Sequence, residues 1–309
     1  MATARQIDPT HTLTIRRSFM SEASRRWRAV ASAVRKALID RHVLGLTANA
    51  DLPPERAFAF ESDPRKVDDF MNWLDEMVDD EILEVTEGPI TGGQPWSNKY
   101  IRRAYGRGTE DAWMAMKKAD LVDPDEAFDL EAAFRQPFHA DRAALLYQRT
   151  YSEIKGATEA MKTALHRELT QGISEGDGPR SIARKLKDVF EGKAGRQRAL
   201  TIARTETIRA HAEASLNSYE QVGLQDVQVE AEWSTAGDDR VCELCLPLDG
   251  VVMPIKEARG LLPRHPNCRC AWLPATVNAK EPTQKRGKTA EKAVAKSASR
   301  SAQPWAGAL

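Results

Sequence analysis

Hydrophobic residues recur every three or four positions along most of the chain, which predicts a mainly helical protein. The clearest run lies within residues 14–45, where seven apolar residues form one stripe along a 3.6-residue period: Ile15, Phe19, Ala23, Trp27, Val30, Val34 and Leu38. Gly45 is the predicted end of this helix. A second helix is predicted to begin at Asp63-Pro64, with an apolar face of Val67, Phe70, Met71, Leu74, Met77 and Val78.

Glycines divide the rest of the helical pattern into shorter segments. A third helical stretch, residues 98–118, is expected to be broken by Gly106 and Gly108. Three more helices are predicted downstream, over residues 141–172, 179–192 and 196–221. After them the period changes, because Val227, Val229, Ala231 and Trp233 alternate as in a strand, and a turn at Leu248–Val252 enters another strand.

Charge changes this picture only locally, because 45 basic and 45 acidic residues cancel over the whole chain. Residues 1–50 carry nine basic and three acidic groups, whereas residues 51–87 carry three basic and thirteen acidic groups. Such segregation favours a polar interface or assembly surface, although solvated helix faces would look the same. No apolar run approaches the roughly 18 residues of a membrane span, and the first residues lack an apolar signal segment, so we expect an intracellular protein without a membrane anchor.

All four cysteines lie in one short segment, together with one histidine. Cys242 and Cys245 are two residues apart, and His265, Cys268 and Cys270 follow about twenty residues later. Paired spacing of this kind is typical of a structural zinc site, in which four protein ligands leave no position for water. Five candidates compete for four places: we favour Cys242, Cys245, His265 and Cys268, and Cys270 is the alternative to His265. The other interpretation is a set of reduced cysteines in a small core.

The predicted fold class is therefore mainly α, with an elongated helical body and a small C-terminal α+β module that one structural Zn²⁺ per chain stabilises. No nucleophile and base stand at an identifiable spacing, so no catalytic residue and no organic cofactor are predicted. For the triplet Arg204-Thr205-Glu206 we expect a structural role, in which Arg204 and Glu206 fix their helix against the strand of Trp233.

Two enzymatic interpretations compete with a structural role. His211-Ala212-Glu213 followed by Cys242 and Cys245 matches the outline of a zinc deaminase, with Glu213 as the proton shuttle. The sequence has Val241 where that motif has proline, and the match leaves His265, Cys268 and Cys270 unused. An H-N-H-type nuclease would need a second histidine near His265, and none follows residue 211.

Three segments together resemble a known family: residues 202–223 (IARTETIRAHAEASLNSYEQVG), 233–250 (WSTAGDDRVCELCLPLDG) and 263–270 (PRHPNCRC). They are similar to the phage Mu F-like head morphogenesis domain, and residues 156–186 and 98–108 resemble the helices before it. The resemblance implies a minor capsid protein of a tailed phage or prophage that acts in procapsid assembly at the portal vertex. It also implies the portal protein and the major capsid protein as partners, and a location in the virion, or in the host cytoplasm during assembly.

The sequence thus predicts three regions. Residues 1–97 form a helical region with segregated charge, and residues 98–275 form the Mu F-like domain, with helices in 141–222 and the strands and Cys/His module in 227–275. Residues 276–309 form a disordered basic tail. From residue 277 onward this tail has seven basic and two acidic residues and no apolar period, so non-specific binding to duplex DNA is expected. The alternatives are a plain solubilising tail and a docking peptide for an acidic patch such as residues 51–87.

Overall fold

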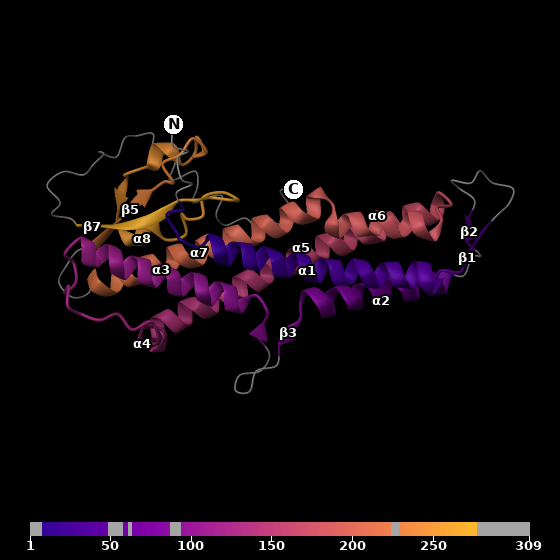
Figure 1. Ribbon diagram of the computed structural model, residues 1–309, viewed down its shortest axis with the longest axis horizontal. Helices are drawn as coiled ribbons and strands as arrows, with labels where there is room; N and C mark the ends of the chain where they lie inside the picture. Colours follow the sequence, from indigo (N-terminus) through magenta and orange to yellow (C-terminus); the bar gives the residue numbers. More distant parts are fainter. Residues whose placement is uncertain (1–7, 49–57, 61–63, 87–93, 224–228, 277–309) are drawn as a thin grey trace. The chain divides into compact units, whose positions relative to one another are not determined.

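The computed structural model describes residues 8–48, 58–60, 64–86, 94–223 and 229–276 (Figure 1). The predicted tail at 277–309 and Val227 lie outside these residues. The described part is mainly helical, as predicted, with helices α1 (Leu13–Arg35), α2 (Pro64–Ile82), α3 (Asn98–Lys118), α4 (Leu130–Arg135), α5 (Pro137–Ser174), α6 (Pro179–Glu191), α7 (Lys193–Gly223) and α8 (Ile255–Ala258). A π-helical segment η1 (Lys36–Asp40) follows α1, and a 3₁₀ turn η2 (Leu246–Leu248) precedes β6.

The strands form three small antiparallel sheets. Two are hairpin-like pairs, β1 (Leu46–Ala48) with β2 (Phe58–Phe60), and β3 (Val85–Thr86) with β4 (Gln94–Pro95). The third has the order β6-β5-β7 and consists of β5 (Val229–Ser234), β6 (Val252–Met253) and β7 (Ala271–Thr276). This is the small C-terminal sheet that the alternating pattern predicted.

The chain divides into two compact units. Of the described residues, those within 8–18, 97–150 and 203–276 belong to unit 1, and those within 19–96 and 151–202 belong to unit 2. Unit 1 holds the three-stranded sheet and the cysteines, and unit 2 is built from helices and the two strand pairs. The domain boundaries drawn from the sequence stay a prediction.

Helix α1 confirms the predicted stripe and corrects its end. All seven stripe residues are buried, from Ile15 to Leu38. The regular helix ends at Arg35, however, and the π-helical segment ends at Asp40 rather than at Gly45. His42 already has a positive φ of 50°, and Gly45 one of 58°, so the backbone leaves the right-handed helical region before the glycine.

In unit 2 the apolar faces of three helices supply buried residues at helical spacing. Helix α2 buries Phe70, Leu74, Val78 and Ile82, α5 buries Ile154, Met161, Leu165 and Leu169, and α6 buries Ile182, Leu186 and Phe190. Helix α6 begins at Pro179 and is capped by Gly192 as predicted, whereas α5 begins earlier than predicted, at Pro137.

Part of the predicted acidic segment is neutralised inside unit 2. Lys162 of α5 contacts Asp79 of α2 at 2.7 Å, and His166 contacts Asp75 at 2.9 Å. The acidic charge of α2 is therefore used in part to hold α2 against α5.

In unit 1 the expected break of α3 at Gly106 and Gly108 is wrong, because α3 runs without interruption from Asn98 to Lys118. Gly108 instead lies where α3 approaches α7: a Cβ built there would be 2.4 Å from the carbonyl oxygen of His211. Close approach of two backbones, not a bend, explains this glycine. Helix α7 itself is buried on every side over residues 205–219.

The three-stranded sheet packs beside α3 through β7. Figure 1 shows β5 and β7 of this sheet next to each other. In the register of these two strands Trp233 lies opposite Trp272, and their rings meet edge to face at 5.2 Å. The core of unit 1 combines these tryptophans with Leu216 and Tyr219 of α7 and with Cys245, Cys268 and Cys270. Three of the four cysteines are thus part of the packed core, and Cys242 packs against it.

Candidate metal centre

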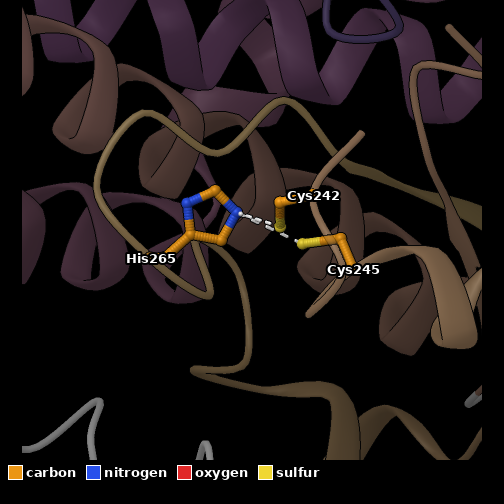
Figure 2. Close-up of side chains that lie close together, drawn as sticks. All are labelled: Cys242, Cys245 and His265. Carbon is orange, nitrogen blue, oxygen red and sulfur yellow. Dashed lines mark hydrogen bonds between the residues drawn. The ribbon is translucent and has the colours of Figure 1, made fainter. Parts of the chain in front are cut away.

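Three of the five predicted ligands meet at one point. The Nε2 atom of His265 lies 3.2 Å from the sulfur of Cys242 and 3.3 Å from the sulfur of Cys245 (Figure 2). Cys245 is 1% exposed, and the other two side chains are partly buried. These residues form a group of donor atoms that all lie within 4.8 Å of one another.

A second group shares Cys245 with the first. Cys245, Cys268 and Cys270 also have their sulfur atoms within 4.8 Å of one another, and all three are buried. The structure therefore brings all five candidates around Cys245, but it gathers them as two overlapping groups of three. The favoured set of four is not one group, because Cys268 groups with Cys270 rather than with Cys242 and His265.

Two similar turns position these donors. The amides of Cys245 and Leu246 both donate to the carbonyl oxygen of Cys242, which closes the loop between the first two cysteines. In the second segment the amide of Cys268 donates to the carbonyl oxygen of His265. The two-residue spacing in each half corresponds to one tight turn, as the sequence predicted.

An ion pair between the two loops was not predicted. Arg269 donates to both carboxylate oxygens of Asp238, at 2.7 and 2.5 Å, and holds the pKa of Asp238 well below its usual value. The sequence signal was slight: opposite charges next to the two cysteine segments. The bidentate contact ties the chain before Cys242 to the chain between Cys268 and Cys270.

The orientation of the His265 ring suits metal binding. Its Nδ1 atom lies 2.8 Å from the carbonyl oxygen of Pro266, which can only accept, so Nδ1 carries the proton in the neutral ring. Nε2 then offers a lone pair toward Cys242 and Cys245. A backbone carbonyl that fixes the tautomer in this way is a common partner of metal-ligating histidines.

The electrostatics of the cluster favour a thiolate at Cys268. Hydrogen bonds from Cys245 and Cys270 lower the pKa of Cys268 well below the ordinary value of a thiol. The contact of His265 with Cys268 raises the pKa of His265 to about 9. Donation toward Cys268 raises the pKa of the Cys245 thiol, so the cluster concentrates negative charge on Cys268.

The spacing of the donors in each group is compatible with a bound metal ion. Zn–S bonds of about 2.3 Å in a tetrahedron would separate sulfur atoms by about 3.8 Å, which lies below the 4.8 Å limit within which the donor atoms of each group fall. Thiolate and imidazole donors are those that zinc prefers. The residues are thus positioned to hold a metal ion.

The deaminase-like residues lie elsewhere in unit 1. His211, in the middle of α7, is 2% exposed and contacts Asp111 at 3.1 Å. Glu213 forms an ion pair with Arg259 at 3.2 Å and accepts the amide of Gly260. Within the described residues neither joins a group of possible metal ligands, and those groups contain a single histidine.

The role predicted for the triplet at 204–206 is corrected, because its arginine makes no polar contact and the ion pairs of its glutamate are with α5 and with its own helix α7. Arg204 forms no hydrogen bond or ion pair within the described residues, so it does not fix α7 against the strand of Trp233. Glu206 is 2% exposed and forms ion pairs with Arg149 at 3.6 Å and with Arg209 at 3.7 Å.

Comparison with known proteins confirms the resemblance for part of the chain. Residues 163–273, a little over a third of the chain, match the model of the family described as Phage Mu protein F like protein. Neither the curated proteins nor the solved structures include a match. Among the described helices, none has both the length and the apolar character that crossing a bilayer requires.

Proposed function

We propose that this chain, whose residues 163–273 are similar to Phage Mu protein F, is a minor structural protein of a phage or prophage head. The family match is the observation that carries the proposal. It covers the C-terminal part of α5, then α6, α7 and nearly all of the Cys/His module, so it includes the most characteristic residues of the chain. In this role the protein acts in procapsid assembly at the portal vertex and is found in the virion.

The Cys/His cluster is proposed to hold one structural zinc ion per chain. Four of Cys242, Cys245, His265, Cys268 and Cys270 would bind it, and Cys245 belongs to both donor groups. A site closed by four protein ligands contributes folding free energy and keeps no position for water. The metal would hold together the two loops that flank β5 and β7.

A structural role also agrees with how the other candidate groups are used. His211 and Glu213, which a deaminase would place at the metal, instead contact Asp111 and Arg259. We therefore propose that the chain is not an enzyme. Its proposed partners are the portal protein and the major capsid protein, and duplex DNA through the basic tail.

The experiment is a protein inventory of purified particles of the phage or prophage that encodes the chain. Quantitative mass spectrometry should find this chain in full and empty heads at a small fraction of the copies of the major capsid protein. A tagged copy should bring the portal protein down from lysates of infected cells. Particles that lack the chain, together with a tagged copy that recovers no portal protein, would contradict the proposal.

A further inference from the structure

A cavity of about 280 Å³ lies in unit 1, between α3, α4, the first turn of α5 and the end of α7. The segment 119–129, which joins α3 to α4, forms the rest of its wall. This volume is close to the lower end of ordinary ligand pockets. Because α3, α4 and the first turn of α5 precede the residues that match the family, the match does not account for the cavity.

Part of the cavity wall is aromatic and uncharged. The rings of Trp113 and Phe128 stack, with their centroids 5.6 Å apart. His139 is buried, and its Nδ1 atom lies 2.7 Å from the hydroxyl of Tyr105, which itself accepts a hydrogen bond from Asn217. The phenol proton is therefore donated to Nδ1. Burial lowers the pKa of His139, so this ring is neutral at pH 7.

The polar residues of the wall have acceptors to spare. Thr109 and Ser218 are buried, and their hydroxyl groups donate to the carbonyl oxygens of Tyr105 and Ala214. Within the described residues these two hydroxyl oxygens accept no hydrogen bond, so their lone pairs remain available. The carboxylate of Glu126 also lines the cavity and, in the same part of the chain, forms no ion pair. A ligand rich in N–H donors would use all three groups.

The cavity and the surface beside it are negatively charged. Two carboxylates, of Glu126 and Asp129, line the cavity, and no lysine or arginine of the described chain does. Outside the cavity the same segment exposes Asp120, Asp123 and Asp125, and residues 119–130 contain no basic residue. A wall of one sign of charge attracts ligands of the opposite sign. The acidic row continues beyond the cavity, which favours an extended ligand with several positive charges.

We propose that this cavity binds an arginine side chain of a basic segment of a partner protein. A guanidinium group has five N–H donors in one plane and stacks on aromatic rings. It therefore matches both the spare acceptors and the wall formed by Trp113 and Phe128. The aspartates outside the cavity would hold neighbouring positive charges of the same segment. The inference does not depend on the proposed role in a phage head.

The probe is a short peptide, acetyl-Ala-Lys-Arg-Lys-Ala-amide, titrated into the full-length protein by calorimetry at constant low ionic strength. A peptide with citrulline in place of arginine has nearly the same shape but no charge there, and it should bind about tenfold more weakly or less. N-acetyl-arginine amide should also bind more weakly than the arginine peptide, because it cannot reach the outer aspartates. Equal affinity of the amide and the peptide would mean a site for a free cation and would overturn the protein partner.

Glu126→Gln tests the charge inside the cavity. The side chain is exposed and has no ion pair to lose within the described residues, so the fold should be kept. We expect this variant to bind the arginine peptide about fivefold more weakly than wild type. Glu243→Gln is the matched control, because Glu243 is likewise exposed and without an ion pair in the described chain but does not line the cavity. Its affinity should stay within about twofold of wild type.

Ala133→Leu tests the cavity itself. Ala133 lines the cavity from α4, and leucine suits a helix and changes no charge, but its side chain occupies the space of the guanidinium. Binding of the arginine peptide should fall about tenfold or more, while urea unfolding shows that the variant folds. Wild-type affinity in Ala133→Leu would place the peptide on the acidic surface outside the cavity. That result, an equal loss in Glu126→Gln and Glu243→Gln, or equal binding of the citrulline and arginine peptides would overturn the proposal.

Discussion

The packing of α3 against α7 should depend on the absence of a single methyl group. At Gly108 a Cβ would lie 2.4 Å from the carbonyl oxygen of His211, 2.8 Å from its Cα and 2.9 Å from the Cβ of Ala214. Two of these atoms belong to the backbone of α7, which is buried on every side over residues 205–219. No rotation of a side chain can relieve the contact, so Gly108→Ala must push the helices apart.

The expected cost follows from two opposing effects. Alanine gains about 0.5–1 kcal/mol over glycine inside a helix. Forcing an extra methyl into a close-packed interface typically costs about 1–3 kcal/mol, and the contact with backbone atoms places this case at the upper end. We therefore expect Gly108→Ala to lower the free energy of unfolding by about 2 kcal/mol.

Gly106→Ala provides the control on the same helix. Its Cβ would lie 3.2 Å from a methyl group of Leu130 and 3.5 Å from the ring of Phe134, both of which are ends of side chains that can shift. The gain in helix propensity should then leave this variant within about 1 kcal/mol of wild type. Urea unfolding followed by circular dichroism and tryptophan fluorescence measures both. Equal stability of Gly108→Ala and wild type, or a larger loss in Gly106→Ala, would refute the argument.

Three further predictions concern the metal, pH and the tail. Cys245→Ser should reduce bound zinc from about one equivalent to near zero by elemental analysis. The control Leu244→Ser, in the same loop, should retain the metal. A wild-type protein that is metal-free yet fully folded would contradict the site. Burial lowers the pKa of His139 to about 4. An unfolded histidine gains its proton below about pH 6.5, whereas His139 in the folded chain does so only near pH 4. The free energy of unfolding should therefore fall by up to about 3 kcal/mol as the pH is lowered from 6.5 to 4. A His139→Gln variant with the same pH dependence would exclude this cause. Deletion of residues 277–309 should weaken the binding of duplex DNA. It should also remove the slope of roughly −3 to −5 that is expected when the logarithm of the binding constant is plotted against the logarithm of the salt concentration. An unchanged slope would show that the tail does not touch DNA.

The sequence predicted those parts of the fold in which one helix face packs on one neighbour. The stripe from Ile15 to Leu38 is buried without exception because a single apolar face is what a 3.6-residue period encodes. Helix α7 departs from this rule: Ala210, Ser215 and Ser218 are as buried as Leu216. Small polar and apolar residues allow neighbours to approach from every side, and periodicity cannot reveal neighbours that other segments of the chain supply.

The candidate site shows the same division between local and non-local information. Two-residue spacing predicted the turns that place Cys242 by Cys245 and His265 by Cys268, because each turn is local. The sequence could not show that Cys270 would also lie near Cys245, since that depends on where β7 pairs with β5. Nor could it show the contact of Arg269 with Asp238, which joins two separate loops.

The geometry of a helix explains why Arg204 and Glu206 do not share the role that the sequence suggested. Residues two apart on an α-helix point in directions about 200° apart, so they face different neighbours. Glu206 forms ion pairs with Arg149 and Arg209, whereas Arg204 forms none within the described residues. Removing the charge of Glu206, which is buried, weakens its ion pairs with Arg149 and Arg209, which should cost about 3 kcal/mol of stability.

Arg204→Gln should change the same free energy by less than about 1 kcal/mol, since the side chain has no partner to lose within the described residues. Urea unfolding of the two variants should therefore separate clearly, with Glu206→Gln destabilised and Arg204→Gln close to wild type. If Arg204→Gln destabilises the chain as much as Glu206→Gln, both residues serve the fold.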